Sequence, residues 1–420
     1  ATPFDQPLNE WDVSNVEDMT QMFFRCESFN QDLSNWDVSK VTSMSSMFRN
    51  AEAFNGDIST WNTSSVLSIQ GIFQNAIAFN QDISQWDVSK VTDLSFTFFG
   101  AESFNQDLND WDISNAESLY AIFNGARSFN GAIGEWNTSN VTDLSTAFKG
   151  AASFNQNINA WDVSSVNYFD GLFAEASSYN QPLNNWNISG TETLTNIFYR
   201  AYAFNQDISS WDVSGVKDMQ GMFQFASSFN QDLSAWNFDS VSNMDYMFWE
   251  AESFDQDLSK WNVGNVSTMM DMLSYSGMSR ENYDSTLIAW DVADFPARPL
   301  GAHELTFCAA EQAVINLFNK GWVITGHRKD CPTSVLTSGD FDEVQFFPNP
   351  ATDYISIRLP DNHTLRDIRI IDQTGKERAR IPAGRAYQRI PVSELNPGIY
   401  WIQFRNRKGH HHIRPIMVQP

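Results

Sequence analysis

The chain has 420 residues and is strongly acidic, with 26 Lys and Arg, 51 Asp and Glu, and a formal net charge of −25. Hydrophobic residues make up 42% of the sequence and aromatic residues 14%, which is enough for a continuous core. Such an excess of carboxylates repels nucleic acid and anionic lipid, so neither is expected as a partner. No stretch is long and apolar enough to predict a membrane span.

A 25-residue repeat occupies the first two thirds of the chain. It recurs without insertion and places tryptophans at Trp11, Trp36, Trp61, Trp86, Trp111, Trp136, Trp161, Trp186, Trp211, Trp236 and Trp261. This constant length predicts that the repeats stack as coils of a solenoid, each covering the apolar face of the next. Ala1 falls inside a repeat, so we expect further residues before it in the parent protein.

The second repeat, residues 29–53, shows how one coil is expected to fold. Trp36, Asp37 and Val38 alternate inward, outward and inward, as in a half-buried strand. Ser39 then stands at the position of a helix N-cap. The residues that follow on one face of the expected helix are Val41, Met44, Met47, Phe48 and Ala51. We therefore predict one short strand and one short helix per coil, with parallel strands along one face.

The pattern FNQDxSxWDVSxVTxMxxMF resembles the repeat of bacterial surface proteins grouped as BspA-like leucine-rich repeats, which are abundant in Bacteroidetes and mycoplasmas. The resemblance covers residues 1–277. It implies a leucine-rich-repeat-like α/β solenoid displayed outside the cell, with cell adhesion as the usual function and no assigned chemistry.

An Asp or Asn follows each tryptophan, on the outer face of the predicted strand. The aspartates considered for a ligand-binding face are Asp12, Asp37, Asp87, Asp112, Asp162 and Asp212. A second acidic column, which includes Asp32, lies four residues before the tryptophans. Two interpretations stay open. These side chains could satisfy backbone groups at turns, or their oxygens could bind Ca²⁺ or another ligand. The tryptophans themselves are expected in the core.

The repeat register ends after Leu273, and residues 278–331 follow a different pattern. Residues 309–320 read as an amphipathic helix that stops at Gly321. The sequence FCAAEQA resembles the start of the terminal module that often follows these repeats. We therefore expect this segment to cover the last coil.

Cys308 and Cys331 lie close together in this terminal module. A disulfide between them would suit an extracellular chain. The alternative is a pair of unrelated buried thiols.

Residues 332–345 are small, polar and aperiodic, and are interpreted as a linker. Short alternating strands follow over residues 346–420 and predict a small immunoglobulin-like β-sandwich. The segments FFPNPATDYISIRL, IRIIDQTGKE and LNPGIYWIQF resemble the C-terminal sorting domain of type IX secretion cargo. The positions that match the motifs of that family are Pro348, Asn349, Pro350, Asp353, Gly375, Asn396, Pro397, Gly398 and Tyr400.

The second resemblance implies that this domain binds the type IX translocon and its outer-membrane shuttle protein. The protein would then cross the outer membrane and be secreted or held at the cell surface, often after removal of the domain. The final segment, HHHIRPIMVQP, departs from the lysine-containing strand that is usual in the family. Pro415 would interrupt strand pairing unless this strand lies at the edge of a sheet.

Enzymatic signatures are absent from the sequence. It contains no HExxH motif, no triad-like context and no Gly-rich phosphate loop, and its paired carboxylates recur in every repeat. We therefore expect a non-enzymatic surface rod that binds an extracellular protein or glycan through many weak contacts. The alternative is a stalk or spacer for another domain N-terminal to this chain. No cofactor is expected unless the acidic columns bind Ca²⁺.

Overall fold

The computed structural model describes residues 4–331, 345–347, 351–358, 366–372, 376–381, 387–405 and 411–419. The chain forms two compact units, Ala1–Cys331 and Pro332–Pro420, and each is described separately below. Neither helix in the described part of the chain has the length and apolar character needed to span a bilayer.

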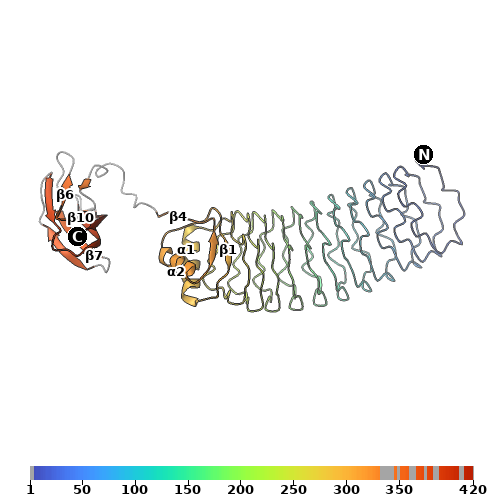
Figure 1. Ribbon diagram of the computed structural model, residues 1–420. Helices are drawn as coiled ribbons and strands as arrows, with labels where there is room; N and C mark the ends of the chain where they lie inside the picture. The colour runs from blue at the N-terminus through green and yellow to red at the C-terminus, as the bar shows by residue number, and fades with distance from the viewer. Residues whose placement is uncertain are drawn as a thin grey trace. The chain divides into compact units, whose positions relative to one another are not determined.

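The first unit is a stack of 25-residue coils (Figure 1). Adjacent coils are joined by isolated parallel bridges such as Asp18 with Ser43 and Ser43 with Ser68. At the second of these bridges the Met44 N–H donates to the Ser68 carbonyl at 2.9 Å. Because each bridge joins residues 25 apart, one coil sets the height and rotation of the next.

The predicted strand and helix of each coil are both wrong. Residues 36–38 lie outside any strand, and the described part of the repeats contains no helix. The parallel bridges fall instead at residues such as Ser43, inside the segment expected to be helical. We call this part of each coil, residues 42–50 in the second coil and their equivalents, the ladder segment.

The backbone of the ladder segment explains why no helix forms. The Phe48 N–H donates to Ile72 in the next coil at 2.9 Å, whereas the Ala51 N–H donates back to Phe48 at 3.0 Å. Ser46 and Asn50 have φ angles of 56° and 58°, in the left-handed region that ends right-handed helices. The segment is therefore a series of tight turns that share their hydrogen bonds with the neighbouring coil.

Aromatic side chains fill the interior of the coils in continuous stacks. The ring centroids of Trp36 and Trp61 are 6.3 Å apart, and those of Phe48 and Phe54, where the third repeat begins, are 3.8 Å apart. In the nine coils with tryptophans from Trp36 to Trp236, each indole N–H donates to a backbone carbonyl 28 residues earlier, at 2.7–3.2 Å. These indoles are thus buried and paired, as a core tryptophan requires. Trp11 differs, since 55% of its side chain is exposed.

An asparagine ladder runs beside the aromatic stacks. The Asn55 N–H donates to Asn30 Oδ1 at 2.7 Å, and the Asn80 N–H donates to Asn55 Oδ1 at 2.8 Å. The amide of Gln81 donates to the Asn55 carbonyl at 2.8 Å. The Asn-Gln pair of the repeat therefore satisfies backbone groups between coils, a role that the sequence analysis did not assign.

Residues 278–331 close the end of the stack with two helices and two small parallel sheets. The elements are α1 (Arg280–Ala293), β1 (Pro299–Gly301), β2 (Thr306–Phe307), α2 (Glu311–Asn319), β3 (Val323–Thr325) and β4 (Arg328–Lys329). Strand β1 continues the ladder, because Leu300 bridges Met269 of the last coil. Strands β1 and β3 pair, as do β2 and β4. Helix α1, which the sequence analysis missed, buries Tyr283 and Trp290.

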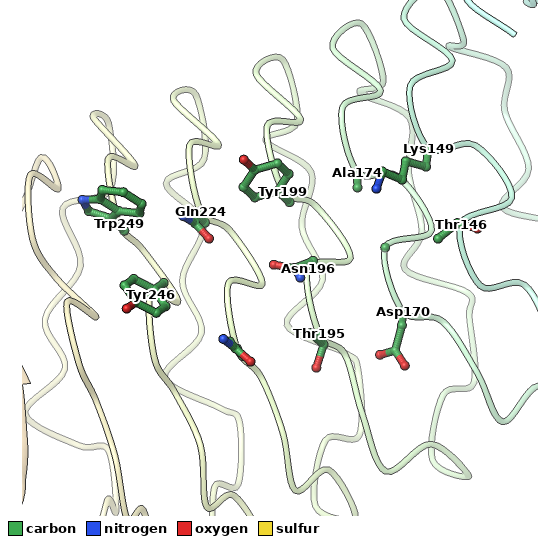
Figure 2. A pocket seen from close by; sticks show the side chains of 12 residues that line it. Thr146, Lys149, Asp170, Ala174, Thr195, Asn196, Tyr199, Gln224, Tyr246 and Trp249 are labelled. Carbon is green, nitrogen blue, oxygen red and sulfur yellow. The ribbon is translucent and has the colours of Figure 1, made fainter. Parts of the chain in front are cut away.

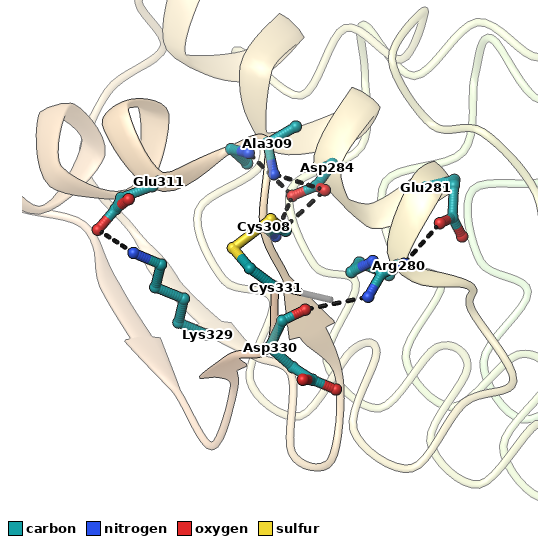
Figure 3. The surroundings of a disulfide bond; sticks show 10 residues. Arg280, Glu281, Asp284, Cys308, Ala309, Glu311, Lys329, Asp330 and Cys331 are labelled. Atoms are coloured by element: carbon teal, nitrogen blue, oxygen red, sulfur yellow. Dashed lines mark hydrogen bonds and ion pairs between the residues drawn. A yellow bond between two sulfur atoms is a disulfide. The ribbon is translucent and has the colours of Figure 1, made fainter. Parts of the chain in front are cut away.

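Cys308 and Cys331 form a disulfide with a Cα–Cα distance of 4.7 Å, at the start of helix α2 (Figure 3). The Asp284 carboxylate of helix α1 is buried beside this bond. It accepts backbone hydrogen bonds from Cys308, Ala309 and Ala310, each at 2.9 Å. The Asp284 carboxylate thus accepts from N–H groups at the start of helix α2 that would otherwise have no partner. Its negative charge is also stabilised by the positive end of the helix dipole.

In the described residues of the second unit, seven strands form two antiparallel sheets. The strands are β5 (Gln345–Phe347), β6 (Tyr354–Arg358), β7 (Arg366–Asp372), β8 (Glu377–Ile381), β9 (Tyr387–Pro391), β10 (Gly398–Arg405) and β11 (His411–Val418). One sheet has the order β5-β6-β9 and the other β11-β10-β7-β8. Ile355 and Ile390 of the first sheet share a core with Ile370, Ile402 and Ile416 of the second.

Two predictions about this unit concern its ends. Strand β11 lies at the edge of its sheet, with Pro415 opposite Trp401, so the proline occupies the kind of strand in which it is tolerated. The predicted linker, residues 332–345, lies outside the described residues except for Gln345 at the start of β5.

The residues with positive φ angles predict that a substitution to glycine stabilises the fold. Ser46→Gly should raise the free energy of unfolding by about 0.5–1 kcal/mol, because glycine adopts a positive φ without the steric cost borne by serine. Ser34→Gly is the matched control at a residue outside the left-handed set, and should lower the free energy by a similar amount. Urea unfolding of both variants measures the difference. Equal changes in both would contradict the assignment.

Removing the buried carboxylate should destabilise the end of the stack. Asp284→Ala leaves three backbone N–H groups of the 308–310 segment without their acceptor, and should lower the free energy of unfolding by about 3 kcal/mol. Asp330→Ala, at an exposed residue of the same region, serves as the control and should change it by less than about 0.5 kcal/mol. Thermal unfolding of the oxidised protein measures both.

Candidate functional site

The predicted ligand-binding aspartates all form local turns. The six side chains accept a hydrogen bond from the backbone N–H of the serine two residues later, at 3.0–3.1 Å. The Asp87 carboxylate also accepts from the hydroxyl of Ser89 at 2.6 Å. All six aspartates are exposed. The geometry matches the turn interpretation, in which Asx side chains satisfy backbone groups.

Hydrogen bonds lower the pKa of the aspartates that form these turns. The hydroxyl of the following serine, and then its backbone N–H, lower the pKa of Asp12, Asp37, Asp87, Asp112, Asp162 and Asp212. A neighbouring carboxylate acts in the opposite direction, since Asp12 raises the pKa of Asp37 and Asp87 raises that of Asp112. The hydrogen bonds outweigh this repulsion, so the columns are ionised at neutral pH.

The second acidic column uses the same geometry. Asp32 accepts from the Ser34 N–H at 2.8 Å, and Asp57 accepts from the Ser59 N–H at 2.9 Å. Among the residues that the structure describes, no group of three or more His, Cys, Asp or Glu side chains is placed to hold a metal ion. Ca²⁺ needs six to eight converging oxygens, so the arrangement of these columns gives the calcium interpretation no support.

A groove of about 600 Å³ lies elsewhere, across the ladder segments of five successive coils (Figure 2). One position of the repeat lines it in all five coils, with Lys149, Ala174, Tyr199, Gln224 and Trp249. We call this depression the aromatic groove.

Small residues create the depression. Gly171 and Ala174 are buried and leave the surface of their coil low, whereas the coils on either side carry Lys149 and Tyr199. Gly171 has a φ angle of 62°, which glycine adopts without strain. The floor of the groove is therefore backbone and small side chains, and its walls are long side chains from neighbouring coils.

None of the residues that line the aromatic groove was among the predicted site residues. Its aromatic residues depart from the repeat consensus, whereas the predicted site residues recur from coil to coil. A weak signal was present, because Tyr199 and Trp249 occupy a position that varies widely between coils, from Ala174 and Gln74 to Phe24 and Phe99. Two large aromatic side chains at neighbouring variable positions on the surface point to contact with a partner.

The sorting residues lie in the second unit. The Val392 N–H donates to the Asp353 carbonyl at 2.9 Å. The Tyr400 hydroxyl donates to the Asn396 carbonyl at 2.9 Å, which fastens the turn before β10 to its own strand. Pro397 and Gly398 are exposed in and beside the same turn. Pro348, Asn349, Pro350 and Gly375 lie outside the described residues.

Comparison with known families gives two matches. The profile described as "Mycoplasma protein of unknown function, DUF285" matches residues 1–80, 57–139, 92–205 and 185–290. The profile described as "Secretion system C-terminal sorting domain" matches residues 345–419. No curated protein matches the chain.

The turn-forming aspartates predict acid sensitivity. Their folded-state pKa lies below the ordinary value of about 3.9, so they stabilise the fold above that pH and lose this contribution as the pH falls below it. The free energy of unfolding should therefore drop between about pH 5 and pH 2.

A variant with Asn at all six positions provides the control. Asn187 already makes the same turn, accepting from the Ser189 N–H at 3.2 Å, so the variant should keep its stability at pH 7. Its unfolding free energy should fall less steeply with acid. Urea unfolding at several pH values compares the two proteins, and identical pH profiles would refute the role of these carboxylates.

Proposed function

The chain belongs to the family described as "Mycoplasma protein of unknown function, DUF285", and we propose that it is a surface-exposed rod that binds an extracellular ligand. The sorting domain directs export by type IX secretion, as a cell-surface or secreted protein, and interacts with that secretion machinery.

The aromatic groove is the observation that carries the binding proposal. Tyr199, Tyr246 and Trp249 line it together with amide side chains, on the outside of a rigid stack. Soluble proteins seldom expose clustered aromatic rings unless the surface contacts a partner. A stack held by inter-coil hydrogen bonds keeps such side chains in place before the ligand arrives, which lowers the entropic cost of binding.

We further propose that the coils are a BspA-like, leucine-rich-repeat-type solenoid without the helix of the predicted coil, and that the tail is an immunoglobulin-like sandwich. The stacked parallel bridges support the first proposal, and the two antiparallel sheets with a common core support the second. The exported rod would act in adhesion and not in catalysis. An outer-membrane shuttle protein would bind the sandwich during export.

Export is tested by moving the sorting domain. Deletion of residues 346–420 should leave the protein in the periplasm, because the secretion machinery no longer recognises it. Fusion of residues 332–420 to an unrelated periplasmic protein should carry that protein to the surface. Protease shaving of whole cells measures exposure in both cases. Unchanged surface display after the deletion would contradict the assignment.

Adhesion is tested on whole cells. Cells that display the full chain should attach to a surface coated with extracellular-matrix glycoproteins several times more than cells from which the gene is deleted. The control is a strain that exports the sorting domain fused to an inert passenger, which should attach like the deletion strain. Equal attachment of all three strains would overturn the binding proposal.

A further inference from the structure

The walls of the aromatic groove are held in place by contacts outside it. The Phe225 ring lies between two of them, 5.1 Å from Trp249 and edge-on to Tyr199 at 5.7 Å. The guanidinium of Arg200 lies over both Phe225 and Tyr199, at 5.0 and 5.1 Å from the ring centroids. Tyr246 packs against Trp249 at 5.6 Å. The rings thus form a preorganised surface of apolar faces.

Neutral polar groups lie between the rings. Asn196, Gln220 and Gln224 line the groove, and each amide offers both donors and acceptors. Thr195 and Thr146 add hydroxyl groups. The Thr146 hydroxyl is buried and has no hydrogen-bond partner within the described chain. A ligand that enters the groove therefore meets many uncharged hydrogen-bonding groups beside aromatic faces.

The charge of the groove differs from that of the rest of the stack. From Phe346 onward the chain has 12 of its 26 Lys and Arg but only 6 of its 51 Asp and Glu, so the preceding residues carry a formal charge of about −31. The residues that line the groove include one cation, Lys149, and one carboxylate, Asp170, so their formal charges cancel. The nearby Arg200 guanidinium is stacked on Tyr199 and Phe225. The Asp170 carboxylate already accepts the Thr193 hydroxyl at 2.7 Å. This local balance favours a neutral ligand.

The backbone beneath the groove is already paired. The Gly171 N–H donates to Thr195 at 2.9 Å, and the Asn196 N–H donates to Gln220 at 2.9 Å. An extended peptide binds a sheet through free backbone groups at a strand edge, and this floor offers no such edge. Recognition therefore depends on side-chain amides, hydroxyls and rings.

We propose that the aromatic groove binds a neutral oligosaccharide, an inference that rests on the proposed binding function and names its ligand. A sugar ring has apolar C–H faces that stack on aromatic rings and hydroxyl groups at its rim that pair with amides. Trp249 and Tyr199 would supply the stacking surfaces, and Asn196 and Gln224 the hydrogen bonds. Five coils at about 4.8 Å spacing give a length of roughly 20 Å, which accommodates several linked sugar units.

The groove variants are chosen to separate binding from folding. Trp249→Ala and Tyr199→Ala remove the walls without touching the buried core. Ala174→Tyr fills the floor with the side chain that the next coil carries at the same position. Phe99→Ala is the matched control, since Phe99 occupies that repeat position outside the groove. Equal thermal unfolding of the four variants and the parent protein confirms that all are folded.

The purified full chain is tested in buffer with EDTA on an array of neutral oligosaccharides, including hexamers of glucose, N-acetylglucosamine and N-acetyllactosamine. At least one should bind, and each groove variant should weaken binding tenfold or more, whereas Phe99→Ala should change it less than twofold. Absence of binding to every glycan would overturn the inference. Groove variants that bind like the parent protein would overturn it too, as would an equal loss in the control.

The whole-cell assay distinguishes the failure of this inference from the failure of the proposed function. Periodate oxidation of the coated surface destroys sugar diols and should abolish attachment, whereas mild proteolysis that leaves glycopeptides should not. Attachment that survives periodate and the groove variants would mean a protein ligand, which refutes the groove assignment but leaves adhesion intact. Attachment independent of the displayed protein would refute adhesion itself.

Discussion

The first unit depends on the pairing of each coil with the next at a constant offset. The bridges, the asparagine ladder and the tryptophan N–H bonds all join residues 24 to 28 apart, so each needs the neighbouring coil at the same height and rotation. The aromatic stacks add a steric requirement, because the Trp36 and Trp61 rings overlap only in register. A single inserted residue would displace every one of these contacts beyond it. This explains why the repeat tolerates substitution but not a change of length.

The sequence predicted the stacking and the core but not the local backbone. The period and the burial of the tryptophans after Trp11 follow from spacing and residue type. The Cys308–Cys331 disulfide is one of the two alternatives that the sequence left open. The helix prediction failed because Val41, Met44, Met47 and Phe48 have helical spacing whether they line a helix or a chain of turns. The Asn and Gly residues at positions such as Asn50 and Gly100 were the available signal, since both adopt a positive φ readily.

The sequence was sufficient to locate the acidic columns but not the aromatic groove. The acidic columns are visible in the sequence because they recur in the repeats. They recur because each carboxylate forms a turn within its own coil. In the motif Asp37-Val38-Ser39 the carboxylate satisfies a backbone group two residues away. The aromatic groove could not be located in this way, since its wall residues are separated by 50 or 100 residues. Only stacking brings Lys149, Tyr199 and Trp249 to one surface.

These observations separate the residues that build the stack from those that give it a specific surface. A residue that recurs in every coil is constrained by the coil on either side, and therefore serves the fold. One position of the ladder segment accepts side chains of very different size, because Phe99, Ala174 and Trp249 all donate their backbone N–H to the residue three positions earlier. Side chains at that position can change without cost to the stacking contacts. A long repeat protein can thus acquire a binding site by substitution in a few neighbouring coils, and the departures from its consensus are the residues in which to search for function.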